Sequence, residues 1–384
     1  MIKLSLLVAA LVLNLIAGTA NATVVTPKSD AEVIETLPSA SGSRTEDRKL
    51  RRQWAADPNN PTLAVDLSRR YLEQARTNGD PRFAGQALAV LQAWPEPAKA
   101  PDEVLLMQAT LQQYLHEFDA SARSLELLVK RQPRHPQAWL TLATVRRVQG
   151  RYDASDAACA GLAAAGGGLH ASACQAENQS LRGDADGARA TLKQLLTTPR
   201  LPAETQGWLL TTLAEVETRA GRIGPAEQSY LAALAAHADS YAALSYADFL
   251  FEQERFADAL AQLKGQPRTD GVLLRLAMLG TRLKSADGVR DVREVRERMA
   301  LAAQRPDART THAREQAMFA LWVDGKAERA LELARINVRQ QREPLDVLLL
   351  AQAARAAKSA AGVQDAAKVK NEMGLHDSRL DALL

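Results

Sequence analysis

Two consecutive stretches of the chain decide its fold: PDEVLLMQATLQQYLHEFDASARSLELLVKRQP (residues 101–133) and HPQAWLTLATVRRVQGRYDASDAACAGLAAAGG (residues 135–167). When they are aligned, Phe118 falls on Tyr152, and both are followed by Asp-Ala-Ser. Each stretch holds two short amphipathic segments with a turn between them. Self-similarity at a fixed period of about 34 residues is typical of a stacked repeat architecture.

The same pattern continues along the chain. Each pair of amphipathic segments is too small to bury its own apolar face, so neighbouring pairs must stack. We expect small residues to let the helices approach closely, at Ala109, Ala143, Ala176, Ala214 and Ala247. We expect glycine to end helices with a left-handed cap, at Gly150, Gly183, Gly221 and Gly325.

Composition agrees with a helical protein. Of 384 residues, 72 are alanine and only 4% are aromatic, which disfavours a β-sandwich or barrel and suits closely packed helices. The 48 basic and 45 acidic residues leave a net charge of only +3. We therefore expect no nucleic-acid partner, because a polyanion-binding chain carries a larger positive excess.

Six residues of the second stretch resemble the pattern of the tetratricopeptide repeat (TPR) family: Trp139, Leu142, Ala143, Gly150, Tyr152 and Ser155. The closing proline of that pattern fits Pro133, Pro267 and Pro344. The resemblance covers residues 58–384 and is clearest over 102–265, although Arg146 replaces the usual tyrosine. It implies an all-α, right-handed superhelical solenoid of antiparallel helix pairs, about eight or nine of them, with one concave wall.

The N-terminus predicts export. Residues 1–22 combine Lys3, an apolar run and the small-x-small site Ala20-Asn21-Ala22, which is the pattern of a cleavable signal peptide. The alternative is an uncleaved membrane anchor, for which the apolar run is short. We expect a bacterial periplasmic protein that is soluble after cleavage.

We divide the chain into five parts: a signal peptide (1–22), a flexible leader (23–48), an atypical N-terminal helix pair (49–100), a repeat array (101–343) and C-terminal capping helices (344–384). The turn at residues 77–83, TNGDPRF, resembles one in a group of exported bacterial TPR proteins. That resemblance brings no established activity with it.

The two cysteines flank the glycine-rich turn at 163–169. Cys159 precedes Gly166 by seven residues and Cys174 follows it by eight, so an antiparallel helix pair places them side by side. We predict a disulfide, since the periplasm is oxidising. Two buried thiols are the alternative, and the absence of a CxxC motif argues against a redox-active pair.

No motif for chemistry is present. The six histidines lack HExxH or HxxxH spacing, and there is no GxSxG, P-loop or GxGxxG sequence. We therefore expect no catalytic residue, metal site or cofactor. A hydrolase built on helical repeats remains the less favoured alternative, because it needs converging acid and base groups.

Function is expected on the concave wall, where the first helix of each family repeat presents side chains inward. Aromatic residues and arginine anchor protein contacts. The resemblance places the following partner-binding candidates there: Gln113, Tyr114, Arg147, Trp208, Arg219, Tyr241, Phe251 and Trp322. The leading hypothesis is a protein or peptide groove serving envelope assembly, transport or secretion. The alternative is a scaffold subunit that docks on a membrane complex by its convex face; any single aromatic could instead fill the core.

Overall fold

The computed structural model describes residues 42–78, 82–303 and 312–384. The predicted signal peptide lies outside these residues, as does most of the predicted leader. Two compact units make up the chain, residues 1–48 and 49–384, and the repeats all lie in the second.

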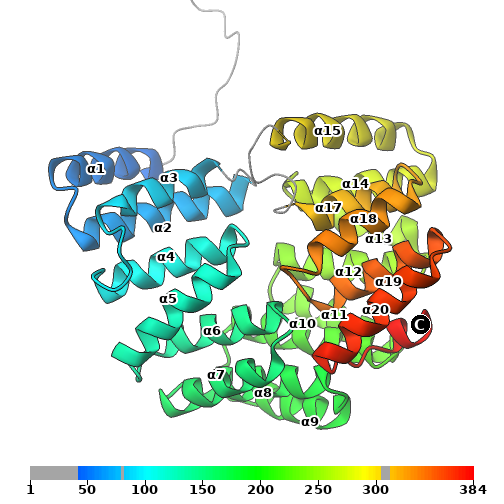
Figure 1. Cartoon of the computed structure of the whole chain (residues 1–384), viewed down its shortest axis with the longest axis horizontal. Coiled ribbons are helices and arrows are strands. Elements are labelled where there is room, and N and C mark those ends of the chain that lie inside the picture. Colours follow the sequence, from blue (N-terminus) through cyan, green and yellow to red (C-terminus); the bar gives the residue numbers. More distant parts are fainter. Residues whose placement is uncertain (1–41, 79–81, 304–311) are drawn as a thin grey trace, which may run out of the picture. The chain divides into compact units, whose positions relative to one another are not determined.

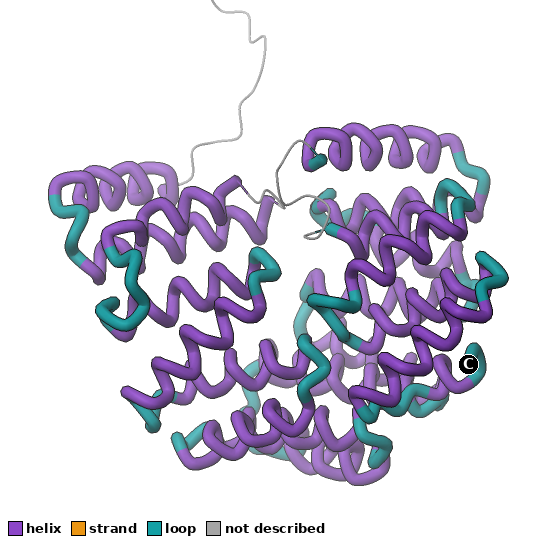
Figure 2. Tube along the Cα trace, in the orientation of Figure 1, coloured by secondary structure: helices purple, strands orange, loops and turns teal. Residues whose placement is uncertain are grey.

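Every regular element in the described residues is a helix (Figures 1 and 2). The elements are α1 (Gly42–Ala56), α2 (Pro61–Asn78), α3 (Arg82–Val90), η1 (Leu91–Ala93), α4 (Asp102–Tyr114), α5 (Phe118–Arg131), α6 (Pro136–Val148), α7 (Tyr152–Ala164), α8 (Gly168–Leu181), α9 (Ala185–Leu196), α10 (Ala203–Arg219), α11 (Ile223–Ala236), α12 (Ser240–Glu252), α13 (Phe256–Leu263), α14 (Asp270–Leu283), α15 (Ala286–Ala302), α17 (Ala313–Trp322), α18 (Ala327–Asn337), α19 (Pro344–Ala356), α20 (Ala360–Met373) and α21 (Ser378–Asp381).

From α2 onward the helices form nine consecutive pairs within the described ranges, beginning with α2 and α3 and ending with α19 and α20. The two helices of each pair pack together, and successive pairs stack. The predicted fold class is therefore confirmed: the repeats form a superhelical solenoid of antiparallel helix pairs. The first members of the pairs are called first helices below.

Helix α1 begins before the predicted end of the leader. Residues 42–48, which the sequence analysis assigned to the leader, are helical. Leu50 and Trp54, four residues apart on this helix, pack against the first hydrophobic cluster of the repeats. Side chains at this spacing share one face, so these two residues hold the second half of α1 against that cluster.

Small residues set the distance between the paired helices, as predicted. The five alanines of the repeat pattern are at most 2% exposed. Ser121 Oγ donates a hydrogen bond to the carbonyl of Ala109 at 2.8 Å, and Ser155 Oγ donates to the carbonyl of Ala143 at the same distance. The same contact in two consecutive repeats confirms the alignment made from the sequence.

The predicted glycine turns are also confirmed, because Gly150, Gly183, Gly221 and Gly325 all have positive φ. Other repeats place a residue with a side chain in the same left-handed conformation at this turn, namely His116, Glu254, Lys284 and Lys358. A left-handed backbone costs such residues free energy that glycine avoids.

The last repeats contact the middle of the solenoid as well as their neighbours in sequence. The largest hydrophobic cluster joins Tyr152 and Leu181, from α7 and α8, with Met373, Leu375 and Leu380 near the C-terminus. The predicted capping helices therefore close across the inner side of the solenoid. None of the described helices is long and apolar enough to cross a membrane.

Candidate functional site

A charged cavity of about 280 Å³ lies on the inner wall, lined mainly by first helices from α6 to α19. Ion pairs between neighbouring first helices cross its wall. Arg147 of α6 contacts Glu177 of α8 at 2.9 Å. Arg275 of α14 donates two hydrogen bonds to the carboxylate of Asp248 of α12, at 2.7 and 2.6 Å. These pairs connect successive repeats along the cavity.

Arg314 of α17 contacts two carboxylates of this wall. It donates to both carboxylate oxygens of Asp346, whose side chain is fully buried, and also contacts Glu343. Burial raises the pKa of Asp346 even though Arg314 acts to lower it. Asp346 also accepts hydrogen bonds from the Glu343 backbone and from Asn337, so it fixes the start of α19.

Glu215 and Arg219 lie one turn apart on α10 and differ from the other charged residues of the cavity. Glu215 accepts hydrogen bonds from the Tyr241 hydroxyl at 2.7 Å and from Ser245 Oγ at 3.3 Å, and burial raises its pKa. Arg219 is buried and donates to Ser180 Oγ at 3.3 Å, while its Nε has no hydrogen-bond partner among the described residues. Neither forms an ion pair in the part of the chain that the structure describes.

An aromatic cleft of about 460 Å³ lies beside the charged cavity. The Phe251 ring of α12 meets the Trp322 ring of α17 edge-on, with centroids 5.5 Å apart. Arg282 of α14 places its guanidinium 5.1 Å from the centroid of Trp322 and 6.0 Å from that of Phe256. Aromatic rings with an arginine stacked on them are the residue types that dominate binding energy at protein interfaces.

Arg379, near the C-terminus, lies between the two hollows. It lines both of them, together with Glu252 at the end of α12. Its guanidinium donates to the two carboxylate oxygens of Glu252 at 3.0 and 2.9 Å. The same guanidinium also donates to both oxygens of buried Asp377, at 2.9 and 2.6 Å.

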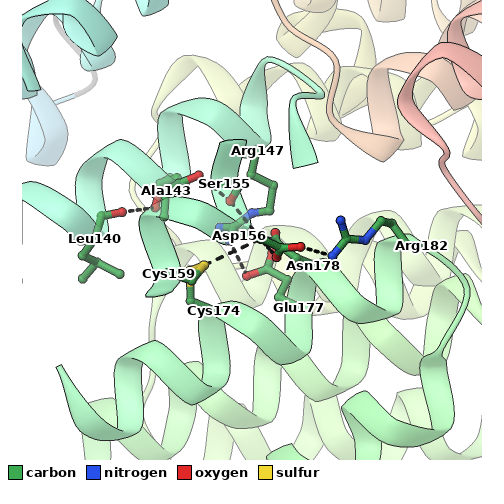
Figure 3. Close-up of a disulfide and its surroundings, with 11 residues drawn as sticks. Leu140, Ala143, Arg147, Ser155, Asp156, Cys159, Cys174, Glu177, Asn178 and Arg182 are labelled. Carbon is green, nitrogen blue, oxygen red and sulfur yellow. Dashed lines mark hydrogen bonds and ion pairs between the residues drawn. A yellow bond between two sulfur atoms is a disulfide. The ribbon is translucent and has the colours of Figure 1, made fainter. Parts of the chain in front are cut away.

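The two cysteines lie where the sequence predicts them, on facing helices α7 and α8 (Figure 3). Cys159 and Cys174 are at disulfide distance, with Cα atoms 5.9 Å apart. Fully buried Asn178 donates to Ser155 Oγ at 2.9 Å and to Asp156 at 2.8 Å beside them. The pair therefore holds together the two helices that the triple-glycine turn connects.

A polar hollow of about 800 Å³ lies at the edge of the solenoid. It is lined by the turns after α4 and α6, by the loop before α19 and by the end of α20. Within residues 42–78, 82–303 and 312–384, no group of three His, Cys, Asp or Glu side chains is arranged to hold a metal ion.

Known proteins resemble this chain in structure only. No protein-family model matches it, and no curated protein matches its sequence. A Rap protein solved in complex with competence and sporulation factor is 11% identical, with a TM-score of 0.52 over 86% of this chain and 92% of that one. A tetratricopeptide repeat protein from Parabacteroides merdae is 14% identical, with a TM-score of 0.47 over 58% of this chain and 84% of its own. The chain has the tetratricopeptide repeat fold.

Five of the eight predicted partner-binding residues line the inner hollows. Arg147, Arg219 and Tyr241 line the charged cavity, while Phe251 and Trp322 line the aromatic cleft. The other three line neither hollow: Gln113, Tyr114 and Trp208. Trp208 instead stacks on His170 of the neighbouring first helix, with centroids 5.5 Å apart.

The sequence analysis missed Arg282, Glu252 and Arg379. A TPR alignment places Arg282 at the end of a first helix, one turn after the inward-facing Met278, so its position could have been found. Arg379 lies outside the repeat pattern, and it reaches Glu252 only because the last repeats return to the middle of the solenoid. No spacing in the sequence signals that contact.

Proposed function

We propose that this chain is a non-catalytic module that holds a protein or peptide partner on the inner wall of its solenoid, in the periplasm. The aromatic cleft carries the proposal. Phe251 and Trp322 form its apolar part, and Arg282 stands at its edge without a carboxylate partner in the described residues. A segment that presents an apolar side chain next to an acidic one matches these two features.

Two further observations support this role. The Rap protein of the same fold is described in complex with a factor, so a solenoid of this shape can form such a complex. The signal-peptide pattern of residues 1–22 supports the periplasmic location. N-terminal sequencing of the periplasmic protein should find a chain that starts at Thr23; a chain that retains Met1 in the membrane fraction contradicts this location.

The function can be tested by crosslinking in intact cells followed by mass spectrometry. Photo-crosslinkers at the rim of the cleft, beside Arg282, should capture a partner that crosslinkers on the outward-facing second helix α9 do not capture. Trp322→Ala should reduce that capture, because it removes one of the aromatic rings that line the cleft. Trp208→Ala is the matched control, since this tryptophan lines neither inner hollow.

Circular dichroism must show unchanged helicity in both variants for the comparison to count. Equal capture by Trp322→Ala and Trp208→Ala contradicts a role for the cleft. Crosslinks confined to the second helices favour the alternative, a scaffold that docks by its convex face.

A further inference from the structure

The carboxyl ends of four successive first helices lie side by side and form a ledge. These ends are Val148 of α6, Leu181 of α8, Arg219 of α10 and Glu252 of α12. The last carbonyl groups of a helix have no partner within the helix and carry a partial negative charge. The ledge therefore favours a ligand that brings hydrogen-bond donors and positive charge.

The chain supplies such a ligand itself, the C-terminal segment Gly374–Leu384. The backbone N–H of His376 donates to the carbonyl of Leu181 at 2.8 Å. Arg379 forms an ion pair with Glu252 at the end of α12. At the first of the four helix ends, the backbone N–H of Arg342, in the loop before α19, donates to the carbonyl of Val148 at 2.7 Å. Two backbone N–H groups and one guanidinium therefore meet the ends of α6, α8 and α12 in that order.

Glycine lets the segment come this close. A Cβ atom on Gly183 would lie 3.1 Å from the His376 ring, and one on Gly221 would lie 3.0 Å from Ser378 Oγ. By contrast, a Cβ atom on Gly325, at the equivalent turn of a later repeat, would meet nothing within 4 Å. The glycines along the ledge therefore serve the segment as well as the turn.

The segment also covers part of the inner wall. Arg379 lines both the charged cavity and the aromatic cleft, and Ala382 and Leu383 line the cleft. If the segment left the ledge, both hollows would widen along one groove formed by the first helices from α10 to α19. The space that a partner needs is thus partly occupied by the chain's own terminus.

We propose that the ledge is a binding surface for an extended, arginine-bearing segment, and that the C-terminal segment is its displaceable intramolecular occupant. The inference rests on the proposed function, since displacement matters only if a partner then enters the groove. A short segment can open locally while the elements before it stay folded. Leu375, Asp377 and Leu380 of this segment are buried, with both leucines in the largest hydrophobic cluster, while His376 and Ser378 remain exposed.

The first test supplies the segment in trans. A fluorescent synthetic peptide with the sequence of residues 371–384, NEMGLHDSRLDALL, is titrated into the full chain and followed by anisotropy. Arg379→Glu in the protein should weaken its own segment, because it places a carboxylate against Glu252, and should increase peptide affinity by about tenfold or more over the wild type. A peptide carrying the same substitution is the matched control and should not bind.

The second test locks the segment in place. The Cβ atom of a residue at 221 would lie 3.6 Å from Ser378 Cβ, which suits a disulfide. The oxidised Gly221→Cys/Ser378→Cys protein should not bind the peptide. In the wild type, hydrogen exchange should be faster across residues 374–384 than across the middle of α8, and the lock should abolish that difference.

Two outcomes overturn the proposal. One is an Arg379→Glu protein that retains its helicity but binds the peptide no better than the wild type or the locked protein does. The other is exchange across residues 374–384 that is as slow as in α8, which makes the segment a permanent part of the fold. Neither outcome changes the crosslinking result at the cleft, so the proposed function stands or falls separately.

Discussion

Arg379 and Glu252 are 127 residues apart in the chain and form a two-point ion pair, with N–O distances of 3.0 and 2.9 Å. The pair joins the C-terminal segment to the end of α12. Burial raises the pKa of Glu252, although the nearby Arg379 guanidinium acts to lower it.

Breaking this pair should destabilise the fold measurably. Arg379→Ala leaves two poorly solvated carboxylates, those of Glu252 and Asp377, without their cation and should lower the free energy of unfolding by about 3 kcal/mol. In a double-mutant cycle with Glu252→Ala, the two losses should not add, because either change removes the same interaction. Urea unfolding of the four proteins measures this, and additive losses contradict the coupling.

Two glycine substitutions separate the cost of the turn from the cost of the C-terminal contact. The Cβ atom of Gly325→Ala would meet nothing within 4 Å, and the backbone there has φ +65°. This change should therefore lower the free energy of unfolding only through the left-handed backbone, by about 1 kcal/mol. Gly221→Ala has a similar backbone requirement, at φ +71°, and also pushes against Ser378 Oγ, so it should lower stability more and should speed hydrogen exchange across residues 374–384. Equal losses, with no change in exchange, mean that the position of Ser378 does not depend on Gly221.

The cysteine pair should contribute to stability through the 15 residues that separate Cys159 from Cys174. Closing a loop of this length is worth about 3 kcal/mol in the chain-entropy model. The Cys159→Ser/Cys174→Ser protein should lose about that amount, and reductant should destabilise the wild type but leave this variant unchanged. Intact-mass measurement showing two free thiols in the periplasmic protein excludes the bond.

Glu215 should make stability depend on pH. Burial raises its pKa above the ordinary value of 4.5, so the folded state binds the proton more tightly than the unfolded state does. Stability contributed by this proton is present at low pH and is lost as pH rises from 4.5 through the raised pKa. Glu215→Gln keeps an acceptor for Tyr241 and should stabilise the protein at pH 7 by on the order of 1 kcal/mol, with no gain near pH 4.

The control for that prediction is Glu177→Gln. Glu177 is paired with Arg147 at 2.9 Å, so loss of its charge should destabilise the protein at pH 7 instead. Denaturant midpoints measured from pH 4 to 8 distinguish the two carboxyl groups. A Glu215→Gln protein that is less stable than the wild type at pH 7 contradicts the burial argument.

The repeat period by itself determined the helix pairs of this protein. Buried alanines such as Ala109 and Ala143, and left-handed glycines such as Gly150, lie where the alignment of residues 101–167 requires them. This prediction succeeds because each contact joins residues that are close in sequence, within one pair or between neighbouring pairs. The placement of Cys159 beside Cys174 follows for the same reason.

Only the tertiary structure decided which hollows the inner wall contains and which residues cover them. Arg379 lies between the two inner hollows, and the C-terminal segment lies on the ends of α8, α10 and α12. Both features depend on the number of repeats after which the superhelix returns to its own middle. Each repeat is rotated slightly relative to the one before it, and the return is the sum of these rotations. No local sequence pattern encodes that sum. A TPR alignment could therefore place Tyr241 and Trp322 on the inner side but could not show that the chain's own terminus lies there with them.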